Sequence, residues 1–112
     1  MIRNITIDAS RITGWDSFHD VFAETFGFPE FYGRNMDAWI DCMTGLDDAP
    51  GEAITKFTAR VGDIVVICIS SADQLKNQQS EIWDALVECT AFVNYRRIER
   101  DYPAILALSF YV

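Results

Sequence analysis

A run of six apolar residues near the middle of the chain, IVVICI at Ile64–Ile69, dictates much of the architecture. Five of the six are β-branched, and the run follows two turn residues, Gly62 and Asp63. A short, continuous apolar segment of this kind is typical of a strand that is covered on both faces, as strands are in a parallel sheet. We therefore expect Ile64–Ile69 to be such a strand.

Two other apolar segments, Ile2–Asp8 and Ala104–Val112, are also expected to be strands, and stretches with helical periodicity separate the three. Alternation of strands and helices predicts an α/β fold with an open, three-stranded parallel sheet packed with helices. The chain has 112 residues and no internal repeat, so we expect a single domain over 1–112.

Residues 14–26 are expected to form an amphipathic helix, because large aromatic side chains recur there at helical spacing. These side chains are Trp15, Phe18, Phe22 and Phe26. Thr13 and Asp16 have the spacing of an N-terminal capping pair. Gly27 is expected to end the helix, and Pro29 prevents its continuation.

A second, shorter helix is expected to begin after Asn35, which is a good N-cap, and to end at Gly45. Its buried face is marked by apolar residues at positions i, i+3, i+4 and i+7, namely Met36, Trp39, Ile40 and Met43.

The second half of the chain holds further helical segments. An acidic loop at 47–51 precedes a candidate short helix at 52–61, and another candidate lies at 71–79. Ser80 is expected to cap a long helix that ends near Glu99.

The net charge of −8 is concentrated in one third of the chain. Residues 12–52 contain a single base, Arg34, and nine acids: Asp16, Asp20, Glu24, Glu30, Asp37, Asp41, Asp47, Asp48 and Glu52. Such a surface repels nucleic acid and anionic membranes and attracts a basic partner, but it could equally be a solvated face. The N-terminus lacks the pattern of a signal peptide, so we expect a cytoplasmic protein.

Sequence motifs for catalysis, cofactors or metals are absent. The three cysteines, Cys42, Cys68 and Cys89, are widely spaced and form no CxxC pair, so free thiols in apolar surroundings are expected. The single histidine, His19, is expected on the surface of the first helix. Nucleotide-binding glycine motifs are missing, and we predict no cofactor and no metal.

Asp37 and Asp41 are the most informative polar pair. They lie four residues apart on the second helix, opposite its apolar stripe, so both should face solvent. Like charges at this spacing destabilise an isolated helix by about 0.2–0.5 kcal/mol. A solvated acidic face, a two-carboxylate hydrolase and a binding surface are all open interpretations. The hydrolase predicts a pocket between this helix and the 47–52 loop.

Aromatic and polar residues flank the two acids. Phe31 and Tyr32 precede the helix, and Thr44 and Gly45 end it. Aromatic side chains beside carboxylates are typical of the centre of a protein interface. Alternatively, one of the aromatics, Phe31, is a core residue that fixes the start of the helix.

Residues 28–45, FPEFYGRNMDAWIDCMTG, resemble without a gap the loop and second helix of the barstar family. The resemblance implies a barstar-like fold and an intracellular inhibitor of a basic, barnase-type ribonuclease. In that family the helix enters the active site of the enzyme, where its carboxylates replace RNA phosphates.

The resemblance also implies roles for individual residues. Asp41 matches the aspartate that is inserted deepest, and Asp37 matches a second, flanking acid. The other matched partner-binding positions are Phe31, Tyr32, Asn35, Ile40, Thr44 and Gly45.

The chain departs from the family at several positions. Phe31 replaces a tyrosine, Ile40 stands at the position of an interface tryptophan, and Arg34 replaces an acid. Residues 47–62 resemble an insertion. A glutamate on the last helix of the family has two candidate matches, Glu88 and Glu99.

The basic segment near the end of the chain has no counterpart in barstar itself. Its arginines, Arg96, Arg97 and Arg100, are expected to pair with nearby acids such as Glu99 and Asp101.

Taken together, these observations predict a ribonuclease inhibitor that is not an enzyme and is a monomer before it binds. The alternative is an interaction module that keeps the fold and the acidic helix but binds a different basic protein.

Overall fold

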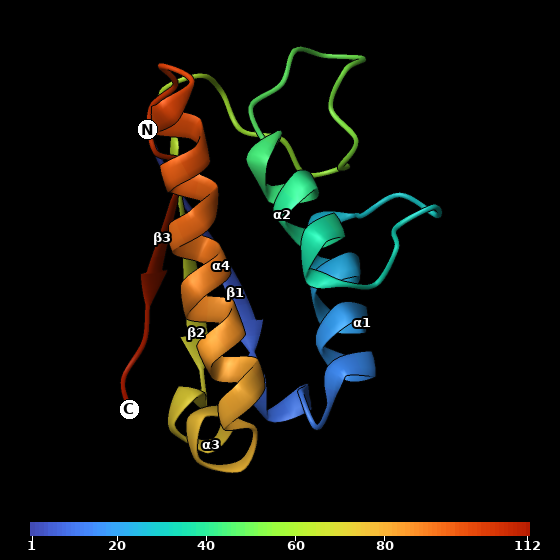
Figure 1. Ribbon diagram of the computed structural model, residues 1–112, viewed down its shortest axis with the longest axis vertical. Helices are drawn as coiled ribbons and strands as arrows, with labels where there is room; N and C mark the ends of the chain where they lie inside the picture. The colour runs from blue at the N-terminus through green and yellow to red at the C-terminus, as the bar shows by residue number, and fades with distance from the viewer.

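A computed structural model describes all 112 residues and has an α/β fold, as predicted. Three parallel strands form one sheet, and four α-helices and one 3-10 turn accompany it (Figure 1). In chain order the elements are β1 (Ile2–Asp8), η1 (Ala9–Arg11), α1 (Trp15–Phe26), α2 (Met36–Thr44), β2 (Ile64–Ser70), α3 (Ala72–Gln78), α4 (Ser80–Glu99) and β3 (Leu106–Ser109).

The central strand of the sheet is β2, which pairs in parallel with β1 and β3. Its burial alternates, however: Val65, Ile67 and Ile69 are buried, whereas the residues between them are only half-buried. The prediction that β2 is covered on both faces is therefore wrong. One face carries the core, and the β-branched residues on the other face retain partial contact with solvent.

The core joins α1, which is rich in aromatic residues, to α2. Phe18, Phe22 and Phe26 of α1 are fully buried, and Trp39 of α2 meets the Phe22 ring edge-on at 5.6 Å between centroids. On its other side α2 packs against α4. This position between α1 and α4 fixes the orientation of the acidic helix.

The ends of two helices differ in detail from the prediction. The N-cap of α1 is Gly14, and its N–H donates to the hydroxyl of Ser17 at 3.2 Å. The side chain that caps the helix is therefore that of Ser17, and not the predicted pair of Thr13 and Asp16. Ser80 is the first residue of α4, not its cap. At the C-terminal end of α1, Gly27 adopts the left-handed conformation expected of a helix-ending glycine.

The predicted helix at 52–61 is wrong, because the backbone N–H groups of this segment bind elsewhere. Lys56 donates to the carbonyl of Gly27 at 2.9 Å, and Phe57 donates to that of Phe26 at 3.0 Å. The segment is thus tied to the end of α1 instead of coiling on itself. The third strand is also shorter than the predicted 104–112, since pairing with β2 covers only Leu106–Ser109.

Candidate functional site

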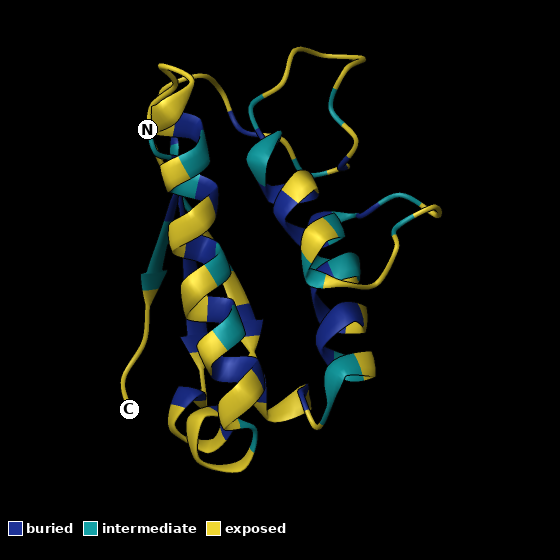
Figure 2. Cartoon of the chain, in the orientation of Figure 1, coloured by how far each residue is buried: buried dark blue, intermediate teal, exposed yellow.

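The acidic helix α2 begins as predicted. The Asn35 side chain accepts a hydrogen bond at 2.8 Å from the N–H of Ala38, which satisfies one of the free donors of the first turn. Trp39, Cys42 and Met43 are buried, whereas Asp37 and Asp41 are exposed. Figure 2 shows this division between a buried and an exposed face along α2. Both acids therefore lie on the face that is open to solvent.

The two aromatic residues before α2 have different environments. Phe31 is 78% exposed and packs against no other ring. Tyr32 is half-buried, and its hydroxyl lies 2.6 Å from Nδ1 of His19. Tyr32, and not Phe31, is therefore the residue that fixes the loop to the core, and Phe31 is left as a free aromatic beside the acids.

His19 is buried, which contradicts the prediction of a surface residue. Burial lowers the pKa of its imidazole, and the nearby charge of Arg34 lowers this pKa further. Burial also raises the pKa of Tyr32, so its hydroxyl keeps the proton. The neutral pair links α1 to the loop that leads into the acidic helix.

Arg34, the one base among the nine acids of this region, is directed away from α2. Its guanidinium lies 3.0 Å from the Asp20 carboxylate and donates at 3.0 Å to the carbonyl of Asp16, both on α1. Arg34 therefore forms no ion pair with the exposed acids of α2.

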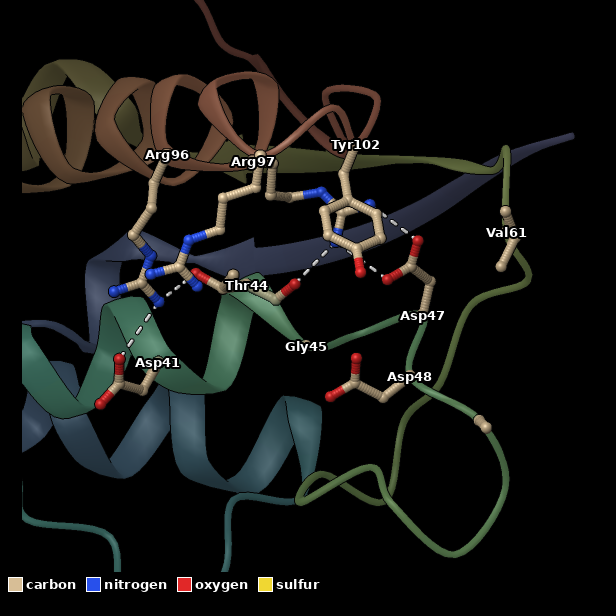
Figure 3. A pocket seen from close by; sticks show the side chains of 11 residues that line it. Asp41, Thr44, Gly45, Asp47, Asp48, Val61, Arg96, Arg97 and Tyr102 are labelled. Carbon is tan, nitrogen blue, oxygen red and sulfur yellow. Dashed lines mark hydrogen bonds and ion pairs between the residues drawn. The ribbon is translucent and has the colours of Figure 1, made fainter.

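Asp41 has an intramolecular partner that its position in the sequence does not reveal. Nη2 of Arg96, on α4, lies 3.1 Å from the Asp41 carboxylate and donates to the Thr44 hydroxyl at 2.9 Å (Figure 3). The Asp41 side chain is nevertheless 66% exposed. Two of the predicted partner-binding residues thus contact one arginine from the far end of the chain.

The neighbouring Arg97 connects three parts of the fold. Its guanidinium forms a two-pronged ion pair with Asp47, at 2.9 and 2.7 Å, and donates to the carbonyls of Thr44 and Pro103 at 2.8 Å each. The prediction that Arg96 and Arg97 pair with Glu99 and Asp101 is therefore wrong. Both reach across to the C-terminal end of α2.

A pocket of about 460 Å³ lies between the end of α2, the loop after it and the end of α4 (Figure 3). Its lining residues are Asp41, Thr44, Gly45, Asp47, Asp48, Ala49, Val61, Arg96, Arg97, Arg100 and Tyr102. The hydrolase interpretation predicted a pocket between this helix and the 47–52 loop, and one is present, but of its two carboxylates only Asp41 lines it. The two carboxylates therefore cannot act together on a substrate bound there.

Ile40 and Cys42 belong to the buried side of α2. Only 9% of Ile40 is exposed, so it offers a partner little surface. Burial and then the charge of Asp41 raise the pKa of the Cys42 thiol to about 11, and this thiol is therefore protonated at neutral pH. All three cysteines are free, and no group of three potential metal ligands gathers anywhere in the chain.

Glu88 is an exposed acid in the middle of α4, and Glu99 is an exposed acid at its C-terminal end. Burial raises the pKa of the Cys89 thiol, and the charges of Glu88 and Asp37 raise it further. Both acids of α4, Glu88 and Glu99, therefore stay candidates for the last-helix contact.

Comparison with known proteins identifies a family and a relative. Residues 2–106 match the family model described as "Barstar (barnase inhibitor)". Over 85 residues the chain is 33% identical to a Bacillus subtilis (strain 168) protein named "Putative ribonuclease inhibitor YrdF", an alignment that covers 69% of this chain and 93% of that protein. The matches confirm the resemblance seen at 28–45. Among the helices, none is long and apolar enough to cross a membrane.

Proposed function

We propose, because the chain belongs to the barstar family of ribonuclease inhibitors, that it blocks a barnase-type ribonuclease by inserting the exposed face of α2 into the active site of that enzyme. Members of this family are inhibitors and not enzymes. The observation that carries the proposal is the exposure of Asp37 and Asp41 on a helix whose other face is buried in the core.

The chemistry of the target supports this use of α2. A ribonuclease active site holds phosphates with cationic side chains, and a carboxylate placed among them forms charge-assisted hydrogen bonds in a desolvated pocket. Asp41 enters deepest and Asp37 flanks it. The remaining acids of residues 12–52 speed the encounter with a basic enzyme, mostly at low salt.

The residues around α2 complete the proposed interface. Phe31 supplies an exposed aromatic surface, and Tyr32 keeps the loop in place. Asn35 lies at the start of α2, whereas Thr44 and Gly45 lie at its end, on the rim of the pocket. Such a protein would act as a monomer in the bacterial cytoplasm, where it would protect the producing cell from its own toxin.

The direct test is titration of the purified protein into a barnase-type ribonuclease, with RNA cleavage as the readout. We expect stoichiometric inhibition, and a loss of affinity of at least about 30-fold for Asp41→Ala. Removing one partner of a buried charge pair costs about 2–5 kcal/mol, and each 1.4 kcal/mol changes the affinity about tenfold. Asp73→Ala, which removes an exposed charge from α3, is the matched control and should inhibit like the unaltered chain.

Inhibition that Asp41→Ala leaves unchanged would refute insertion of this helix. Absence of inhibition at micromolar protein would instead favour the interaction module with a different basic partner, which a pull-down with α2 variants would identify.

A further inference from the structure

We propose that Arg96 is a specificity-determining residue of the interface, and that it selects ribonucleases with a carboxylate beside their cationic pocket. This inference rests on the proposed function. Arg96 contacts two residues of the proposed interface, Asp41 and Thr44, through the same nitrogen. Any partner that receives Asp41 therefore also meets the guanidinium of Arg96.

Arg96 is less free to move than the acid that it binds. Its side chain is 27% exposed, and its Nε is buried without a hydrogen-bond acceptor. A charged group that is partly removed from water depends on its remaining partners, and here the only counter-charge in contact is Asp41. Asp41 can turn toward a partner, whereas Arg96 stays at the contact between α4 and α2.

Insertion of Asp41 into a cationic pocket disturbs this arrangement in either of two ways. If Asp41 leaves Arg96, the partner covers an arginine that has lost its counter-charge. If Asp41 keeps the contact, Arg96 is brought next to the cations of the partner, and like charges repel. Both problems are removed when the partner supplies a carboxylate within reach of the guanidinium.

The proposal therefore defines the partner by two features and not one. A cationic pocket accepts Asp41, and an acidic side chain on its border accepts the free donors of Arg96. A ribonuclease that has the pocket without the acid is bound less tightly, although its overall charge is as favourable. Arg96 and Asp41 are 55 residues apart, so no local sequence pattern indicates this role.

The test is a set of double-mutant cycles with a barnase-type ribonuclease. Each carboxylate that borders its active-site cations is replaced in turn by the amide, and binding is measured by calorimetry because these changes affect catalysis. The inhibitor is used as the unaltered chain, as Arg96→Met and as Lys76→Met. The last variant removes one charge from α3, at the other end of α4 from Arg96 (Figure 1).

We expect at least one amide replacement to weaken binding of the unaltered chain and of Lys76→Met about tenfold, while binding of Arg96→Met changes less than twofold. Equal effects on Arg96→Met and the unaltered chain for every replacement would overturn the inference, because Arg96 would then only position Asp41 or compete for it. Binding so weak that Asp41→Ala also has no effect would overturn the proposed function and this inference together. Circular dichroism of each variant verifies that the fold is kept.

Discussion

Replacement of Arg97 by methionine tests how the C-terminal end of α2 is held. Methionine keeps an unbranched apolar stem but removes the guanidinium, and with it both bonds to Asp47 and the bonds to two backbone carbonyls. The Arg97 side chain is 4% exposed and that of Asp47 is 9% exposed. The variant therefore leaves a buried carboxylate without a counter-charge.

Loss of one member of a buried ion pair costs about 3–5 kcal/mol, a large part of the roughly 5–15 kcal/mol that stabilises a typical domain. For a chain of this size each 1 kcal/mol lowers the melting temperature by roughly 4 °C, so Arg97→Met should melt about 12–20 °C lower. The assays are thermal unfolding, which gives the melting temperature, and urea unfolding, which gives the free energy; both are followed by circular dichroism, and the m-value is expected to stay constant.

Two further variants separate the buried pair from general effects of charge. Arg100→Met removes an exposed charge from the same end of α4 and should change the free energy of unfolding by no more than about 0.5 kcal/mol. Arg97→Met combined with Asp47→Leu removes both charges and should recover most of the loss. If Arg97→Met alone costs less than about 1 kcal/mol, water screens the pair and the reasoning is refuted.

Three other predictions concern the loop and the start of α2. Asn35→Ala removes the N-cap and should lower the free energy of unfolding by about 1 kcal/mol in thermal or urea denaturation, whereas a Ser substitution should keep most of it. Phe31→Ala should leave stability within about 0.5 kcal/mol, because the ring is exposed, and should still weaken binding of a ribonuclease in the calorimetric assay; a stability loss without a binding effect would contradict this. The folded-state pKa of His19 lies below its unfolded value near 6.5, so the unfolded chain binds the proton more tightly, and stability is lost as the pH falls from above 6.5 toward the folded pKa. Urea unfolding at pH 7.5 and 5.0 should show this loss, and the difference between the two should shrink in His19→Gln.

Much of the fold could be predicted because periodicity reports local structure. The apolar run Ile64–Ile69 and the aromatic repeat of α1 are visible within windows of a few residues, and the helix of residues 36–44 is marked by its cap and its apolar stripe. The prediction of a helix at 52–61 was wrong because contacts with a distant segment decide the structure there. Its apolar spacing resembles that of a helix, but its backbone donors are taken by carbonyls at the end of α1, which no local pattern can show.

In the candidate site, too, local features could be predicted from the sequence, and contacts between distant residues could not. Exposure of Asp37 and Asp41 followed from their spacing relative to the buried stripe. The environments of His19 and of Arg96 could not be predicted, since each depends on a partner from another element, Tyr32 in one case and Asp41 in the other. The one available signal was the pair of adjacent arginines on a mostly apolar helix, which indicates a counter-charge but not its identity.

The bond between Arg97 and Asp47 joins residues 50 positions apart, and this has a consequence for the timing of synthesis. A chain elongates at about 5–20 residues per second, so Arg97 emerges roughly 3–10 s after Asp47. Until then the acidic helix has been made, but the carbonyl of Thr44 and the carboxylate of Asp47 lack the guanidinium that they bind. A nascent or truncated chain that lacks the last fifth of the sequence therefore carries the acidic residues without the support that orients them. The C-terminal end of α2 gains these bonds only after most of α4 has been made.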